Sequence, residues 1–158
     1  MDRAMQSNRR PRNKFNWSEE ANELRYKYLK KIKEAYEKFD FSDVFEDLAD
    51  DCSWDGARGK SAVIEKLTKG AATMKERNYW HKCTLVQVDK AVAPMEFNDK
   101  PDGTGEKLMI SLLYNRGEIC MIDKTPRDTS FNRMTISPDG KIQEYYDTLP
   151  SGAYHVIE

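Results

Sequence analysis

The spacing of apolar side chains changes along the chain, at about residue 79. Before this point apolar residues recur at intervals of three and four, which is typical of the buried face of an amphipathic helix. Ser18 is suited to cap the first such helix, because a serine hydroxyl accepts a hydrogen bond from a free N–H of the first turn. The pattern predicts helices near residues 18–39, 42–49 and 60–70.

Beyond residue 79 apolar and polar side chains alternate with a period of two, which indicates strands with one buried face. Turn sequences separate these stretches, notably Asn98–Gly103 and the hairpin turn Ser137–Gly140. Residues 115–128 are expected to extend a strand and then form a loop. The predicted strands cover residues 80–92, 107–114, 130–136 and 141–149, with a short one at 52–55.

The order of these elements predicts an α+β fold. Helices come first and hairpin-connected strands follow, so we expect an antiparallel sheet with the helices on one face. The chain has 158 residues, which suits a single domain. We expect that domain at residues 17–158, preceded by a basic leader at residues 1–16.

Composition excludes several classes of protein. Apolar residues make up 39% of the chain and charged residues 34%, and no apolar run reaches the roughly 18 residues of a membrane helix. Without a visible secretory signal, three widely spaced cysteines (Cys52, Cys83, Cys120) suggest reduced thiols in a cytoplasmic protein. The two histidines, His81 and His155, are too few for a His-rich metal site, and no phosphate-binding loop or nucleophile elbow occurs. We expect no metal, no cofactor and no membrane partner.

Charge is unevenly distributed, although the net charge is only −1. The basic leader is either a solvated segment or an anchor for an anion or RNA. It lacks the interleaved aromatic residues that stack on bases, so we expect no nucleic-acid partner. The leader carries Arg3, Arg9, Arg10, Arg12 and Lys14, whereas residues 40–55 carry the acids Asp40, Asp43, Glu46, Asp47, Asp50, Asp51 and Asp55.

Three motifs resemble the nuclear transport factor 2-like superfamily, which includes ketosteroid isomerases and SnoaL-like polyketide cyclases. The stretch 39–54 resembles the family's short helix followed by L-A-D-D before a strand. The sequence G-K-S-A-V-I from Gly59 resembles the start of its third helix, and D-G-K-I-Q-E from Asp139 resembles its final hairpin. Together the motifs cover residues 18–149, and they indicate the fold more than the chemistry, because this fold hosts many functions.

The resemblance implies a cone-shaped, strongly curved antiparallel sheet wrapped around the long N-terminal helix, with two shorter helices. Such a cone encloses a mostly apolar pocket for a small hydrophobic molecule. Family members commonly form a homodimer through the outer face of the sheet. Apolar residues on both faces of 107–114 support self-association, because a solvated outer face would expose a sizeable apolar patch.

The isomerase pattern fails when it is carried over residue by residue. Its general-base aspartate falls on Gly56, with Asp55 one place away and expected to point out of the pocket unless the strand bulges. The tyrosine of its oxyanion hole falls on Ile32. The protonated acid beside that tyrosine falls near Asn132, whose amide does not titrate, so the resemblance does not imply a ketosteroid isomerase.

The cyclase pattern places its acid/base aspartate on Asp147. By alternation Tyr145 shares a face with Asp147, and a carboxylate in an apolar hollow has a raised pKa that suits proton transfer near neutral pH. His81 resembles a pocket-facing histidine of SnoaL-like sequences, and we expect it to form an acid/base couple with Asp147. Simpler interpretations exist for both: Asp147 paired with a lysine at the rim, and His81 as a packed or surface residue.

Four further residues, Trp54, Tyr145, Asn132 and Tyr114, are expected to line the same hollow. Two functions then remain open. The first is a small-molecule pocket with cofactor-free acid/base chemistry of the cyclase, isomerase or dehydratase class on a hydrophobic substrate. The alternative is a non-catalytic ligand-binding or homo-oligomeric assembly module. Titratable groups that converge in a closed hollow favour an enzyme, whereas an apolar-filled cone favours the module.

Overall fold

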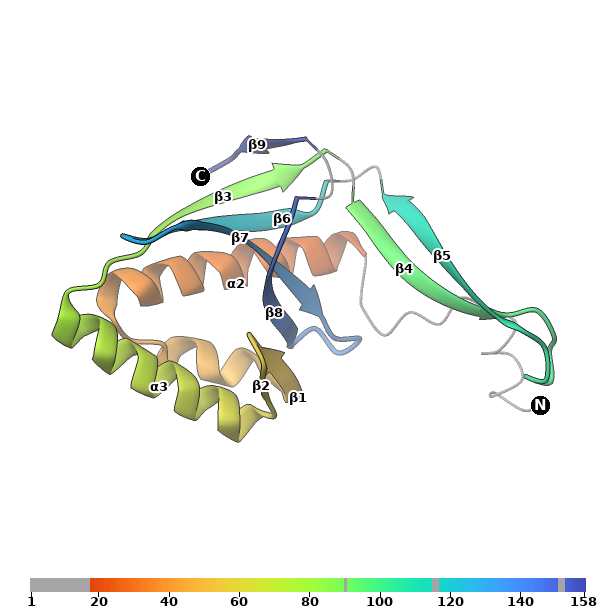
Figure 1. The fold of residues 1–158 in the computed structure, drawn as a ribbon, viewed down its shortest axis with the longest axis horizontal. Helices are drawn as coiled ribbons and strands as arrows, with labels where there is room; N and C mark the ends of the chain where they lie inside the picture. The colour runs from red at the N-terminus through yellow and green to blue at the C-terminus, as the bar shows by residue number, and fades with distance from the viewer. Residues whose placement is uncertain (1–17, 90, 115–116, 151–152) are drawn as a thin grey trace.

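Figure 1 shows the chain as a computed structural model in which residues 18–89, 91–114, 117–150 and 153–158 are described, with the backbone alone at 91–97 and 109–114. The expected leader at residues 1–16 lies outside these ranges. The described chain has an α+β fold, with helices on one face of a mostly antiparallel sheet, as the order of the sequence patterns predicts.

Helical elements form the first layer. The Ser18 hydroxyl accepts the Ala21 N–H at 3.1 Å, so the predicted cap is present at the start of the long helix. Phe39 and Asn78 end the two long helices in the left-handed conformation, with φ of 55° and 52°. The middle element is a 3-10 helix. The elements are α2 (Glu19–Lys38), η1 (Ser42–Asp47) and α3 (Lys60–Arg77).

A seven-stranded sheet forms the second layer, in the order β2-β1-β8-β7-β6-β3-β9. Neighbouring strands are antiparallel except β1 and β8, which run parallel. The described sheet is not closed into a barrel, because β2 and β9 are its two edges. Its strands are β1 (Leu48–Trp54), β2 (Ala57–Arg58), β3 (Lys82–Val88), β6 (Ile119–Lys124), β7 (Thr129–Ile136), β8 (Ile142–Thr148) and β9 (Tyr154–Val156).

The two remaining strands, β4 (Ala91–Asn98) and β5 (Lys107–Tyr114), form a separate two-stranded sheet. This hairpin arm extends away from the seven-stranded sheet, beyond the N-terminal end of α2 (Figure 1). Its turn lies at the predicted turn sequence, where the Asn98 side-chain amide donates to the Gly103 carbonyl at 3.1 Å.

The main core lies between α2 and the face of the sheet that curves around it (Figure 1). Strand residues of one alternation pack against the apolar face of α2, and α3 packs against β1. The fully buried members with the largest side chains include Trp54, Tyr145, Leu29, Ile32, Leu85, Met121 and Met134. Burial of these side chains is the main contribution to stability, because apolar surface removed from water contributes about 25 cal/mol per Å².

Residues of the opposite alternation form a second, smaller cluster on the outer face of the sheet. Its members Val86, Val88, Cys120 and Phe131 are buried within the chain itself. This burial leaves the outer face less apolar area for a partner than the sequence pattern predicts.

The strand boundaries differ from the prediction at the base of the hairpin arm. The expected strand at 80–92 is divided into β3 and β4. Residues 115–128, expected to extend the preceding strand and then form a loop, contain a separate strand, β6. Gly117 lies just before β6 and has a φ of 71°. A Cβ at this position would come within 2.5 Å of the Val88 carbonyl oxygen. This close backbone approach needs glycine, and it marks the point where the arm leaves the main sheet.

Candidate functional site

A histidine–aspartate pair lies at the open end of the core. His81 precedes β3 and Asp123 lies on β6, where register pairs it with Cys83. The Nδ1 atom of His81 is 2.8 and 2.7 Å from the two carboxylate oxygens of Asp123. The two side chains are only 12% and 7% exposed. A carboxylate that holds Nδ1–H fixes the tautomer and leaves Nε2 as the ring atom that can take up a proton.

Aromatic rings fix the orientation of this imidazole. The ring of Tyr36 on α2 stacks on His81 with centroids 4.0 Å apart and an angle of 18°. Tyr79 meets the same imidazole edge-on at 5.7 Å. Burial, and then the charge of Asp123, raise the pKa of the Tyr36 hydroxyl, so Tyr36 stays neutral beside the pair.

The thiol of Cys83 is the third polar group around Asp123. Its Sγ lies 3.8 Å from Asp123 Oδ1, within reach of a weak S–H donor. Burial, followed by the negative charge of Asp123, raises the pKa of this thiol far above its usual value. Since the thiolate is the nucleophilic form, Cys83 is not suited to covalent catalysis.

Tyr145 brings a hydroxyl into the same part of the core. Its ring stacks on Trp54 with centroids 4.3 Å apart, and its side chain is 1% exposed. Among the described residues the hydroxyl finds no hydrogen-bond partner. Its electrostatic neighbours are Tyr36, Asp123 and Cys83, and burial raises its pKa well above the usual value. A buried hydroxyl without a partner costs about 1–3 kcal/mol and needs an explanation.

Asp55 adds a carboxylate near Tyr145. It lies in the Asp55–Gly56 hairpin turn, where both residues have positive φ, and its backbone N–H donates to the Tyr145 carbonyl. Loss of hydration raises the pKa of its carboxyl group, although the backbone N–H of Asp147 donates to it and opposes the rise. Asp55 therefore follows the last residue of β1 in a turn and is not part of the strand.

The structure gives His81 a different partner from the one expected. The expected couple was His81 with Asp147, but the His81 imidazole binds Asp123. Asp147 is exposed near the end of β8, so it does not lie in an enclosed apolar hollow. Its register partner on β7 is Asn132, which is buried and donates to the Ser130 hydroxyl at 3.1 Å.

The other predicted site residues are divided between the core and the arm. Trp54 and Tyr145 are fully buried and stacked, and Asn132 lies in the same alternation as Met134. Tyr114 lies on β5 opposite Ala91, at the base of the hairpin arm, and its side chain lies outside the described part of the structure.

Sequence reasoning missed Asp123 and Tyr36, and it placed Asp55 outside the pocket. Asp123 follows the apolar run 119–122 and shares the alternation of Met121, a signal that an acid in a core-facing position was present. Tyr36 follows the three-and-four spacing of the apolar face of α2, which does not distinguish it from a core residue. In the described residues no three His, Cys, Asp or Glu side chains are arranged to hold a metal ion.

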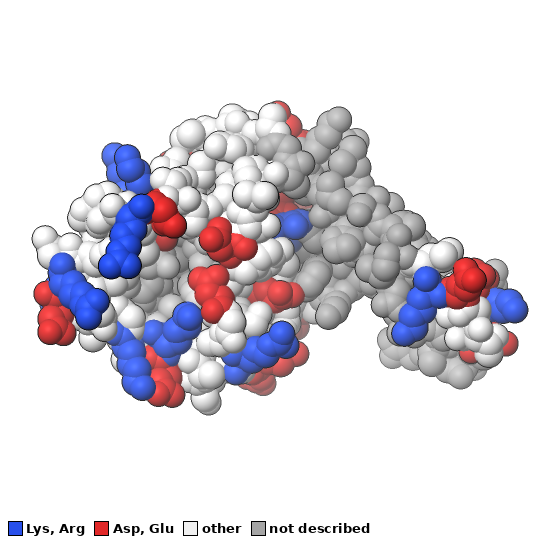
Figure 2. All heavy atoms as spheres, in the orientation of Figure 1, with Lys and Arg blue, Asp and Glu red and all other residues white. Residues whose placement is uncertain are grey.

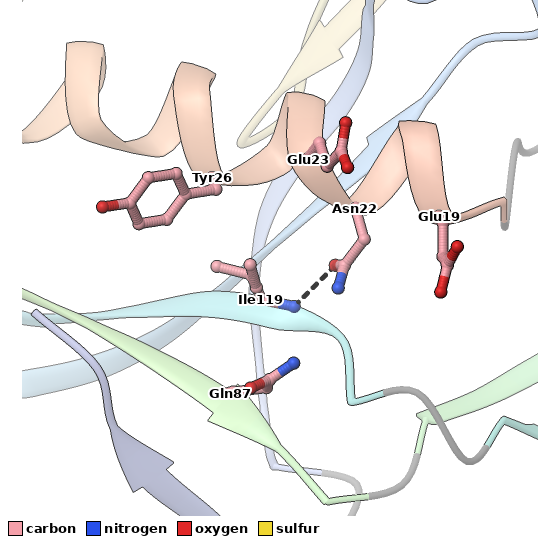
Figure 3. Close-up of a pocket in the computed structure, with 6 residues that line it drawn as sticks. All are labelled: Glu19, Asn22, Glu23, Tyr26, Gln87 and Ile119. Carbon is pink, nitrogen blue, oxygen red and sulfur yellow. Dashed lines mark hydrogen bonds between the residues drawn. The ribbon is translucent and has the colours of Figure 1, made fainter.

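A hollow lies between the start of α2 and the sheet (Figure 3). It has a volume of about 640 Å³. Asn22 joins its two walls, because the side chain accepts from the Ile119 N–H at 3.0 Å and donates to the Gly117 carbonyl at 2.9 Å. Gln87 donates to the same carbonyl at 3.1 Å. The lining is polar and acidic (Glu19, Asn22, Glu23, Tyr26, Gln87, Ile119), and its hydrogen bonds fix the base of the hairpin arm to α2.

On the face shown in Figure 2 positive and negative side chains are interspersed, with no continuous basic patch among the described residues. A buried ion pair lies on the outer face of the sheet, where Arg133 Nε donates to Glu118 at 2.7 and 2.9 Å and its Nη2 donates at 2.8 Å. No helix in the described ranges is long and apolar enough to span a membrane.

Comparison with known families finds a match at the start of the chain. Residues 3–48 are similar to the YvbH-like oligomerisation region. The match covers the leader, α2 and η1, and it ends at the first residue of β1, before His81 and the hairpin arm. No curated protein and no solved structure matches the chain significantly. The matched family is not the nuclear transport factor 2-like superfamily, so that resemblance remains a proposal.

Proposed function

We propose that the protein is a homo-oligomeric assembly module. The observation that carries this proposal is the similarity of residues 3–48 to an oligomerisation region. This agrees with the alternative function drawn from the sequence, in which the fold serves association and not catalysis. A fold class alone would not support that choice, because one fold hosts many functions.

The distribution of exposed apolar side chains supports self-association, but it places the contact surface outside α2. One face of α2 is buried in the core of the chain, and its exposed face carries charged residues such as Glu23, Lys27 and Glu34. Large exposed apolar side chains lie elsewhere: Leu108 on the hairpin arm is 45% exposed, and Val156 on the edge strand β9 is 64% exposed. Exposed apolar groups on an arm and at a sheet edge favour contacts with another chain.

Sedimentation equilibrium of the full chain tests this proposal. We expect a mass at least twice 18.4 kDa at micromolar concentration, with dissociation on dilution. A mass of 18.4 kDa at every concentration up to the millimolar range would contradict the proposal.

A second candidate function is a small-molecule site for proton transfer, favoured by the unpartnered hydroxyl of Tyr145. The hydroxyl can be satisfied by a polar group on a ligand, and the nearby His81–Asp123 pair can exchange a proton through His81 Nε2. The resemblance to SnoaL-like cyclases points to the same part of the fold, and to a small hydrophobic substrate without a cofactor. On this proposal Asp123, and not Asp147, is the partner of the histidine.

Titration with 2-naphthol, followed by NMR, tests the second function, because this probe combines an apolar ring system with one hydroxyl. We expect it to shift the His81 ring signals in the wild type and to lose this effect in Tyr145→Phe. The matched control is Tyr28→Phe, which also removes a buried hydroxyl but one that is bonded to Gly140. An equal response in wild type and Tyr145→Phe, or none at millimolar probe, would contradict this candidate.

A further inference from the structure

The two faces of the hairpin arm differ in composition. Cross-strand partners in an antiparallel pair share a face, and successive pairs alternate between faces. One face therefore holds only apolar residues, in the pairs Ala91–Tyr114, Ala93–Leu112, Met95–Ile110 and Phe97–Leu108. The other face holds the pairs Val92–Leu113, Pro94–Ser111, Glu96–Met109 and Asn98–Lys107, which include charged and polar residues.

The apolar face of the arm is not part of the main sheet. β4 and β5 pair only with each other in the described chain and extend away from the seven-stranded sheet (Figure 1). Leu108, at the outer end of the apolar face, is 45% exposed. A two-stranded sheet is marginally stable in water unless a further layer packs on it.

We propose that the apolar face of the hairpin arm packs against the same face of a second copy of this chain. A twofold axis between two arms would place apolar residues opposite apolar residues over the full length of both strands. This inference rests on the proposed self-association and assigns its contact surface. It also replaces the outer sheet face as the expected dimer contact, since Val86 and Val88 on that face are already buried within one chain.

The area of the face agrees with what a stable dimer needs. An aromatic side chain buries about 150–250 Å². Burial of a Leu, Ile or Met side chain contributes about 1.5–3 kcal/mol, which at about 25 cal/mol per Å² corresponds to about 60–120 Å². Two aromatic and four aliphatic side chains of this size therefore offer on the order of 600–900 Å² per copy when fully covered. A specific protein interface buries about 800 Å² per partner, so one arm against one arm is sufficient.

The leader of the same chain is a poorer occupant for this face. It carries five basic residues (Arg3, Arg9, Arg10, Arg12 and Lys14), and covering an apolar ribbon with them would remove charges from water. A second arm has no such cost along the apolar face. The charged residues Glu96 and Lys107 lie on the opposite face, where solvent can hydrate them.

Two matched variants of the full chain test the inference. Ile110→Asp adds a charge to the apolar face, and Ser111→Asp adds the same charge one residue further, on the opposite face. By sedimentation equilibrium we expect Ile110→Asp to weaken self-association on the order of a hundredfold. Ser111→Asp should stay within about threefold of the wild type. Equal unfolding midpoints for both variants and the wild type, measured at a dilution where all three are monomeric, show that the fold outside the arm is unchanged.

The outcomes separate this inference from the proposed function. A wild type that associates while Ile110→Asp associates equally well overturns the arm as the contact but leaves self-association standing. A wild type that is monomeric at all concentrations overturns both. Equal weakening by the two variants contradicts the assignment of faces.

Hydrogen exchange of residues 107–114 gives an independent measurement on the unmodified chain. Protection of this segment should increase with protein concentration if a second copy covers it. Protection that does not depend on concentration shows that residues of the same chain cover the face, and it overturns the inference.

Discussion

Removal of the Tyr145 hydroxyl should stabilise the protein, although the residue is fully buried. Tyr145→Phe retains the ring that stacks on Trp54 at 4.3 Å and deletes only an oxygen without a described partner. Leaving such a group unsatisfied costs about 1–3 kcal/mol, so its removal should return about 1–2 kcal/mol. In a domain of this size each kcal/mol corresponds to about 2–4 °C, which predicts a melting temperature about 2–8 °C higher.

The control for this prediction is the same chemical change at a bonded tyrosine. Tyr28 is also buried, and its hydroxyl donates to the Gly140 carbonyl at 2.6 Å. Tyr28→Phe leaves that carbonyl without its donor and should destabilise the fold by about 1 kcal/mol. If the two Tyr→Phe substitutions change the free energy of unfolding in opposite directions, the difference comes from the hydrogen bond and not from the loss of an oxygen atom.

Urea unfolding of both variants at one protein concentration measures the difference, since self-association makes stability depend on concentration. A Tyr145→Phe variant that is as destabilised as Tyr28→Phe would refute the reasoning, because the hydroxyl would then have a partner in solution. A stabilised variant that no longer responds to 2-naphthol would show a hydroxyl kept for a ligand at the expense of stability.

Two further predictions concern other buried groups. Glu118→Ala should destabilise the fold by about 3 kcal/mol, because Glu118 is 3% exposed and its loss removes the buried carboxylate that Arg133 binds. Glu65→Ala, at an exposed pair with Lys69, should leave the urea midpoint unchanged, and similar losses in the two variants would contradict this explanation. The three thiols should resist iodoacetamide at pH 8 in the folded chain and react in urea, because burial raises the pKa of Cys52, Cys83 and Cys120 and keeps them protonated. Rapid labelling of the folded chain, followed by mass spectrometry, would show that these sites open more readily than the structure indicates.

The parts of the fold that depend on local sequence were predictable. The period of α2, its Ser18 cap and the turn at Asp139–Gly140 specify elements through neighbours a few residues away. Fold class therefore follows from the pattern. Tyr145 lies opposite Met134 and faces the core, but the register of the β7–β8 hairpin shifts between Thr135 and Ile136, which alternation along β8 alone does not predict.

The partner of His81 could not be predicted in the same way. It depends on the register between β3 and β6, which are separated by the hairpin arm, and a shift of one residue would turn Asp123 to the other face. Gly117 approaches the Val88 carbonyl where the arm leaves the main sheet, and this long-range contact is not visible as a period in the sequence. Asp147 was assigned to the correct alternation, but the exposure of its position near the end of β8 depends on tertiary packing.

The mass of the full chain in solution tests the central claim most directly. Sedimentation equilibrium over a range from nanomolar to millimolar protein should show a reversible change from 18.4 kDa to a multiple of that mass, with a midpoint that Ile110→Asp moves to higher concentration. A single species of 18.4 kDa across the whole range would contradict the assignment of this protein as an assembly module.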